Sequence, residues 1–346
     1  MKKYMLALGL SLLTVLGLFT GCSPKAETAS DSDSLKIVAT IFPEYDWVRQ
    51  ILGDQADHVE LTMLLDNGVD LHSFQPTADD MVTISGCDLF IYTGGESDAW
   101  VEDALSHATN PDLVAVNLMD LLGDQVKAEE TVEGMQETAH LHSHEDEPHD
   151  EHTDEHDEHE HSEECTHAHD DEHIWLSLKH AVILCNAIAD TLGQIDPDHR
   201  DAYAENASAY IQKLTELDGQ YQEVVDSVSN HTLLFADRFP FRYLMDDYGL
   251  SYYAAFSGCS AETEASFETV AFLAEKVDAL SLPCVLTTET ATHNIARTVV
   301  DNTTAQNQQI LVLHSMQSVT ADDVATGVSY LSIMEQNLET LKTALA

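Results

Sequence analysis

The sequence predicts an α/β protein with two lobes, each a parallel sheet flanked by helices, joined by one long helix. Short apolar runs alternate with amphipathic segments in two separate blocks of the chain. Strands separated by helices favour a parallel sheet with right-handed crossovers. Between the blocks lies one long stretch with apolar residues at helical spacing. The 346 residues are enough for a sizeable hydrophobic core.

The first lobe is predicted over residues 35–200. Its first strand is the apolar run at 36–41, and a helix at 43–52 follows, with Gly53 placed to end it. Further strand signals lie at 59–65, 88–93 and 113–118, and helical signals lie at 78–85 and 98–107. This alternation predicts the first parallel sheet.

The second lobe is predicted over residues 229–346 and repeats the pattern. Strand signals lie at 232–236, 251–255, 284–288 and 309–313. Helical signals lie at 240–247, 266–280, 291–302 and 321–345. A helix at 201–228 is expected to join the lobes, because its apolar residues recur every three or four positions. At 1.5 Å per residue it would be a stiff strut roughly 40 Å long.

The amino terminus predicts a lipoprotein signal over residues 1–22. Lys2 and Lys3 precede an uncharged apolar run at 5–19, which is shorter than the roughly 20 residues that span a bilayer. Gly21 followed by Cys22 resembles a bacterial lipobox. We therefore expect Cys22 to carry a lipid anchor and the polar residues 23–34 to form a tether between membrane and domain.

An acidic, histidine-rich run predicts metal handling. Residues 140–173 contain 11 histidines and 15 acidic side chains, with no Lys or Arg. Such a segment cannot bury a core, so a solvated, disordered loop is expected over residues 129–173. Imidazole and carboxylate groups are ligands for divalent metal ions, and short histidine-rich tracts are typical of metal binding.

The composition excludes several other functions. The net charge of −48 would repel nucleic acid and favours attraction of cations.

The cysteines other than Cys22 are irregularly spaced and form no disulfide framework. Cys87 and Cys185 have apolar neighbours and are expected in the core, whereas a bridge between Cys259 and Cys284 stays open. A His-Glu-x-x-His motif, a Gly-x-Ser-x-Gly elbow and a phosphate-binding loop are absent, so the chain is not expected to be an enzyme.

Three histidines follow or border the predicted elements in loops. Ligand clefts in parallel α/β sheets lie beyond the carboxyl ends of the strands. His72 follows the strand at 59–65, His314 directly follows the strand at 309–313, and His173 lies just before a helix. These positions allow His72, His173 and His314 to meet in a cleft between the lobes.

From residue 35 to 346 the chain resembles the metal-specific solute-binding lipoproteins of bacterial ABC uptake systems, in the zinc and manganese group. The segment at 68–76 resembles the family's Gly-x-Asp-Pro-His-x-aromatic-x-Pro motif, with Leu71 in place of the proline. The segment at 171–175 resembles its Asp-Pro-His-x-Trp motif, with Glu172 in place of the proline. The resemblance implies that His72 and His173 are metal ligands. Family members selective for zinc often carry a histidine-rich acidic loop just before the second histidine, as this chain does.

The second lobe departs from the family pattern. Counting back from the aromatic-Gly-Leu sequence at 248–250 puts Arg238 where the family has a His or Glu ligand. A guanidinium cannot bind a cation, so Arg238 is expected to point away or to pair with a carboxylate. Asp237 is the neighbouring candidate for an oxygen ligand. The rival donors left open are Glu264, Glu289 and Cys259. The family's last ligand, an Asp after the final strand, corresponds to His314.

The resemblance and the ligand types together predict a substrate-binding protein. It would capture Zn²⁺ between the lobes and deliver it to an ABC permease and its ATPase outside the cytoplasm. Imidazoles with one carboxylate favour Zn²⁺, whereas Mn²⁺ prefers more oxygen ligands. Two alternatives stay open: manganese as the substrate, and a surface metal buffer or adhesin.

Overall fold

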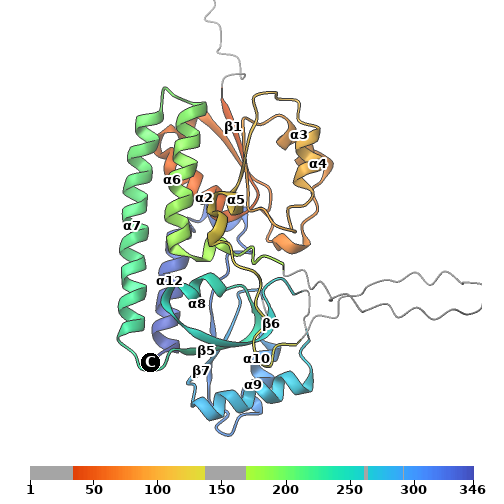
Figure 1. Cartoon of the computed structure of the whole chain (residues 1–346), viewed down its shortest axis with the longest axis vertical. Coiled ribbons are helices and arrows are strands. Elements are labelled where there is room, and N and C mark those ends of the chain that lie inside the picture. The colour runs from red at the N-terminus through yellow and green to blue at the C-terminus, as the bar shows by residue number, and fades with distance from the viewer. Residues whose placement is uncertain (1–33, 137–168, 261–263, 291) are drawn as a thin grey trace, which may run out of the picture. The chain divides into compact units, whose positions relative to one another are not determined.

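The computed structural model describes residues 34–136, 169–260, 264–290 and 292–346 (Figure 1). From Leu35 to Ala346 the chain forms one compact unit. The predicted signal, Cys22 and the tether up to residue 33 lie outside the described residues, as does most of the histidine-rich run, at 137–168. Within the described part, no helix is both long and apolar enough to cross a bilayer.

The first lobe holds a four-stranded parallel sheet with strand order β2-β1-β3-β4. Its strands are β1 (Leu35–Ala39), β2 (Val59–Met63), β3 (Leu89–Tyr92) and β4 (Val114–Asn117). Its helices are α2 (Phe42–Leu52), α3 (Ala78–Ser85), α4 (Val101–Ser106), α5 (Leu118–Leu122) and α6 (Leu178–Ile195). Gly53 ends α2 with φ at +52°, as its position predicts.

The second lobe repeats this topology in the order β6-β5-β7-β8, again with parallel strands. Its strands are β5 (Thr232–Phe239), β6 (Ser251–Ser257), β7 (Cys284–Thr287) and β8 (Gln309–Val312). Its helices are α8 (Arg242–Tyr248), α9 (Phe267–Leu280), α10 (Asn294–Asp301), α11 (Ala321–Ala325) and α12 (Tyr330–Ala344). The predicted fold class, two parallel sheets flanked by helices, is confirmed.

One helix of 27 residues, α7 (Arg200–Asp226), joins the lobes (Figure 1). It packs against α6 and α2 of the first lobe and against α12. Its buried face includes Tyr203, Leu214 and Tyr221, at the spacing that predicted the helix. The lobe boundaries at 200 and 229 stay predictions.

Three sequence expectations need correction, and one alternative left open by the sequence is excluded. The predicted helix at 321–345 is two helices, because Gly327 takes φ at +99° and the Ser329 side chain caps α12. The strand expected to end at 236 continues to Phe239 through a bulge after Phe235. Cys259 and Cys284 are both free thiols, so they do not form the bridge left open above. The predicted loop at 129–173 is too wide, since Met135 is buried and the Gln136 amide donates to the Ala255 carbonyl at 2.9 Å.

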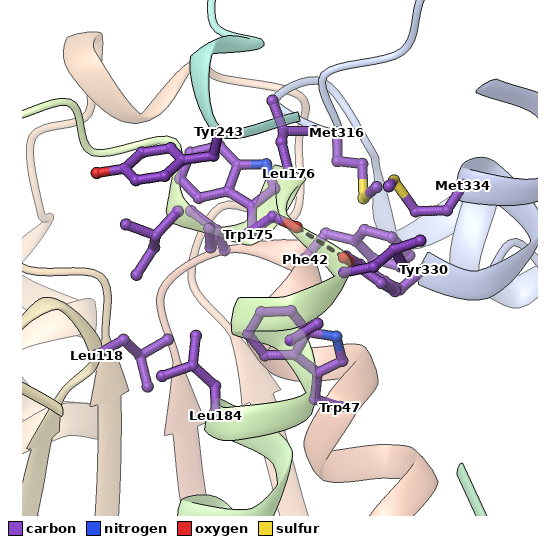
Figure 2. Packing of buried hydrophobic residues seen from close by; sticks show 14 of the residues in the cluster. Phe42, Trp47, Leu118, Trp175, Leu176, Leu184, Tyr243, Met316, Tyr330 and Met334 are labelled. Carbon is purple, nitrogen blue, oxygen red and sulfur yellow. Dashed lines mark hydrogen bonds between the residues drawn. The ribbon is translucent and has the colours of Figure 1, made fainter. Parts of the chain in front are cut away.

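A hydrophobic core runs continuously between the two sheets (Figure 2). In this core Trp175 and Phe42 of the first lobe lie close to Met316, Tyr330 and Met334. The Tyr330 hydroxyl donates to the Trp175 carbonyl at 2.7 Å. The lobes therefore share apolar contacts as well as α7, and this arrangement favours small adjustments over a wide hinge motion.

Glu44 ties the carboxyl ends of β1 and β3 together from inside the first lobe. Its side chain is fully buried. Oε2 accepts from the Thr40 amide and hydroxyl at 2.8 and 2.7 Å, and Oε1 accepts from the Thr93 hydroxyl at 3.0 Å. Burial, with a contribution from Asp98, raises the pKa of Glu44 from 4.5 to about 8.

The buried Glu44 predicts a pH-dependent stability that Glu44→Gln removes. The folded state holds the Glu44 proton up to about pH 8, whereas the unfolded chain loses it near 4.5. This contribution to stability is therefore complete below pH 4.5 and is lost as pH rises toward 8. Urea unfolding with EDTA at pH 5 to 8 measures how the free energy of unfolding changes with pH. This free energy should fall with rising pH more steeply for the wild type than for Glu44→Gln, by about 1.4 kcal/mol per pH unit. Equal slopes would contradict the raised pKa.

Candidate metal centre

Three loops bring His72, His173 and Cys259 together. His72 lies in a short 3-10 helix, Leu71–Ser73, after β2, and His173 directly precedes another, Ile174–Leu176. Cys259 lies in the turn after β6 of the second lobe. One ligand atom from each of the three side chains lies within 4.8 Å of the other two. This group, with an imidazole pair and a sulfur, is a candidate cation site.

His173 presents the lone pair of Nε2 to this group. Its Nδ1 lies 2.8 Å from Asp171 Oδ1, and a carboxylate oxygen only accepts, so Nδ1 carries the proton. The side-chain nitrogen of Gln317 lies 3.4 Å from Asp70 Oδ1 and 3.3 Å from His173 Nε2. Because the Asp70 carboxylate requires a donor, this end of Gln317 is the NH₂ group. The Nε2 atom of His173 therefore accepts.

His72 presents its own Nε2 to the same point. Its Nδ1 lies 2.8 Å from the Ser97 hydroxyl, which can donate or accept, and 3.4 Å from Glu172 Oε2, which can only accept, so this surrounding favours a proton on Nδ1. The two Nε2 atoms of His72 and His173 are 3.1 Å apart. Two lone pairs at this distance repel each other unless a cation lies between them. A tetrahedral zinc ion would hold two imidazole nitrogens roughly 3.3 Å apart, close to the observed separation.

The same local turn positions both histidines. The backbone amide of His72 donates to Asp70 Oδ1 at 3.0 Å, and that of His173 donates to Asp171 Oδ1 at 2.9 Å. In each case the aspartate precedes the histidine by two residues, as expected of an Asx-turn. Sequence reasoning missed the supporting role of Asp70 and Asp171, although this repeated Asp-x-His spacing is visible in the sequence.

Two carboxyl groups beside the histidine pair, those of Asp70 and Glu172, have pKa values below their ordinary range. Burial by itself would raise the pKa of Asp70, but Arg238 and His72 more than offset it and lower the pKa below its ordinary value. For Glu172, hydrogen bonds from His72 and Ser97 likewise outweigh burial and lower the pKa. Burial raises the pKa of the Cys259 thiol, and the nearby Glu129 adds to this effect. The charge around the histidines thus favours a cation.

The core fixes the segment that carries His173. Trp175, two residues on, is buried and donates through Nε1 to the Ser315 carbonyl at 2.8 Å. The Tyr243 hydroxyl donates to the Asp171 carbonyl at 2.7 Å, on the other side of His173. Both partners belong to the second lobe, so His173 is held by contacts with both lobes, and its side chain is fully buried.

The structure does not bring Asp237 and His314, the second-lobe residues expected as ligands, into this candidate group. Arg238 pairs with Asp70 across the lobes at 2.8 Å, which confirms that it pairs with a carboxylate. Asp237 Oδ2 accepts from the hydroxyls of Thr287 and Thr288 at 3.0 and 2.6 Å and from the Thr288 amide at 2.9 Å. Its carboxylate is therefore hydrogen-bonded inside the second lobe, and Asp237 is not in the group of candidate ligands.

His314 also lies outside that group. Its Nδ1 accepts from the Met316 amide at 3.0 Å and lies 3.4 Å from Glu289 Oε1. Glu289 in turn accepts from the Ser315 amide at 2.7 Å. Glu264 is exposed. Of the rival donors that the sequence left open, Cys259 is the one that the structure places beside the two histidines.

A cavity of about 360 Å³ adjoins the histidine pair. His72, Glu172 and Cys259 line one part of it, and the rest is lined by the acidic and imidazole side chains of Glu96, Glu129, His169 and Asp170 together with Ser97, Ser257 and Ser260. His169 is the first described residue after the histidine-rich run, and its Nδ1 lies 2.5 Å from Glu96 Oε1. The cavity is therefore lined by acidic groups and imidazoles, which suit passage of a cation.

Residues 37–344 match the family described as zinc-uptake complex component A, periplasmic, or ZnuA. The chain belongs to the ZnuA family. The resemblance inferred from the motifs is thereby confirmed.

This ZnuA-family chain is similar to two named zinc proteins from different bacterial species. It is 30% identical over 343 residues to the zinc-binding lipoprotein AdcA of Streptococcus pneumoniae, covering 99% of this chain and 61% of AdcA. It is 29% identical over 332 residues to the high-affinity zinc uptake system protein ZnuA of Bacillus subtilis, covering 93% of this chain and 91% of that protein. The chain thus spans about 61% of the length of AdcA.

Solved structures agree with the fold. The Zn(II)-bound ZnuA-like domain of Streptococcus pneumoniae AdcA is similar with a TM-score of 0.66 and 27% identity, over 90% of this chain and 99% of the domain. The metal-dependent lipoprotein YcdH of Bacillus subtilis has a TM-score of 0.68 at 24% identity, over 90% of this chain and 99% of YcdH. Both support the two-lobe architecture.

Proposed function

We propose that this ZnuA-family chain captures Zn²⁺ between its lobes, with His72 and His173 as ligands. The observation that carries the proposal is the pair of Nε2 lone pairs that face each other at 3.1 Å. The Glu172 carboxylate beside them, whose pKa is lowered, offsets part of the charge of a divalent ion, whereas the Asp70 carboxylate is already paired with Arg238. Imidazole ligands favour Zn²⁺ over Mn²⁺, and the relatives named above are called zinc-binding or zinc-uptake proteins.

The bound zinc is then delivered to an ABC permease with its ATPase for import. The chain acts outside the cytoplasm, anchored in the membrane by lipid on Cys22. The histidine-rich run collects zinc at many weak sites and raises its concentration beside the cavity, whose wall includes His169. Family membership supports the import role, because the family is described by zinc uptake.

Complementation of zinc uptake tests this function. In cells lacking the gene, the wild-type chain should restore accumulation of ⁶⁵Zn at scarce zinc, and His72→Ala should not, at equal protein level. His199→Ala, a histidine paired with Asp196 outside the candidate site, is the matched control and should restore uptake. Co-purification of the chain with a membrane permease should accompany uptake. Restored uptake by His72→Ala would contradict the proposed site, and tight zinc binding without any uptake defect or permease would favour a surface buffer.

A further inference from the structure

We infer that the sulfur of Cys259 is a third protein ligand, so that the centre holds its cation with two imidazoles and one thiolate. This inference rests on the proposed function, since it names a further ligand of the same site. The Cys259 sulfur and one ring nitrogen from each of His72 and His173 lie within 4.8 Å of one another. His173 is fully buried and His72 and Cys259 are partly buried, so the group is shielded from bulk solvent.

The turn after β6 is built to reach the histidines. Gly258 lies directly against the His173 ring, where an added Cβ would come within 2.9 Å of Cε1 and of the Phe239 carbonyl oxygen. A larger residue would force the turn away from His173. The Cys259 amide donates to Glu129 Oε1 at 3.1 Å, which fixes the next residue of the turn. The close approach of Gly258 thus brings the Cys259 side chain to the first-lobe histidines.

In this inference, the Cys259 sulfur occupies the role of the second-lobe ligand that the sequence predicted at other positions. Arg238 stands where a ligand was expected and its guanidinium is paired with Asp70. The Asp237 carboxylate is held by Thr287 and Thr288. Among the described residues, Cys259 is the second-lobe member of the candidate ligand group. A site that closes between lobes needs a donor from each, and the sulfur supplies it.

A thiolate changes which cations fit. As the metal–sulfur bond forms, the thiol proton leaves through the adjoining cavity to solvent, so the sulfur contributes one negative charge. Thiolate ligands suit Zn²⁺ and other soft or borderline ions, whereas Mn²⁺ prefers oxygen. Zinc bonds to sulfur at about 2.3 Å, so a small closure of the turn brings the sulfur into range. Three protein ligands leave a fourth coordination position beside the cavity. Water or another ligand can occupy it while the ion enters or leaves.

Cobalt substitution tests the sulfur ligand directly. Co²⁺ bound to a thiolate gives a sulfur-to-cobalt charge-transfer absorption in the near ultraviolet. The chain from residue 23 to 346 contains the whole compact unit and should show this band with one Co²⁺ bound tightly. Cys259→Ser and Cys259→Ala should both lose the band and weaken Zn²⁺ binding by more than the roughly 10- to 100-fold cost of losing a group that only orients a ligand, with a smaller preference for Zn²⁺ over Mn²⁺. Cys165→Ser, which changes the thiol in the histidine-rich run, is the matched control and should keep the band.

The outcomes separate the two proposals. Thermal unfolding of the metal-free variants shows first that both Cys259 variants fold. A band that persists in both, while His72→Ala abolishes tight binding, overturns the sulfur ligand and leaves the histidine site standing. The proposed function is overturned instead if the band requires Cys259 but His72→Ala still binds zinc tightly. Loss of the band only in Cys165→Ser would place the thiolate in the histidine-rich run and also overturn the inference.

Discussion

Replacing His173 with alanine is expected to lower the zinc affinity of the site between the lobes by roughly a thousandfold, or about 4 kcal/mol. His173 supplies one of two facing imidazole nitrogens, and the other lies 3.1 Å away on His72. Loss of a partner that only orients a ligand already costs about 10- to 100-fold in metal affinity. Loss of the ligand itself should cost more. Competition with a chromophoric zinc chelator measures the affinity.

The histidine-rich run must be removed so that its weak sites do not mask the change. Residues 137–168 should be replaced by a short Gly/Ser linker, because a cut that reached Asp171 or Glu172 would remove groups that contact the two histidines. Asp171→Asn in the same background should fall between wild type and His173→Ala. His199→Ala should bind like wild type. Wild-type affinity in His173→Ala would place the tight site elsewhere in the chain.

The fold could be predicted because its signals are local. Most strands of the two sheets contain a short apolar run, and α7 shows its buried face in the spacing of Leu214, Leu217 and Tyr221. The expectation failed at the break between α11 and α12, where residues 321–345 look helical throughout. Gly327 and the cap at Ser329 end that regularity. The glycine and the capping serine are both visible in the sequence, but the helical spacing of apolar residues on either side of them led to the prediction of one helix.

The candidate site could be predicted only where it follows strand ends and short motifs. His72 and His173 come together as expected, because each lies in a turn fixed by the aspartate two residues before it. Cys259 depends on a contact between residues far apart in the sequence, the packing of Gly258 against the His173 ring. No local pattern reveals that contact.

The position of His314 illustrates the same limit. It follows β8 as the sequence predicts, yet its Nδ1 accepts the Met316 amide and faces Glu289 instead of joining the two first-lobe histidines. Whether a side chain after a strand faces the cleft depends on the turn that follows. Here that turn includes Met316, whose φ is +68°. A positive φ at a methionine cannot be predicted from the sequence, because such backbone angles are uncommon for residues other than glycine.

Trp175→Ala is expected to destabilise the chain by roughly 3–5 kcal/mol and to weaken zinc binding as well. The indole is 2% exposed, and its Nε1 donates to the Ser315 carbonyl of the second lobe. Removing the indole leaves a cavity two residues from His173. It also removes a contact that fixes the segment carrying this histidine. Urea unfolding followed by circular dichroism, with EDTA and then with zinc, measures both effects.

Trp47→Ala separates a general loss of stability from a loss of site geometry. Trp47 is fully buried in α2 and packs edge-on against Tyr330, so its removal should destabilise the metal-free chain to a similar extent. Free zinc at a hundred times its dissociation constant stabilises a folded protein by about 2.7 kcal/mol. At one fixed zinc concentration of this size, Trp47→Ala should keep nearly the whole increment and Trp175→Ala should lose most of it. If the two variants kept equal increments, Trp175 would act only as a core residue, and the position of His173 would not depend on it.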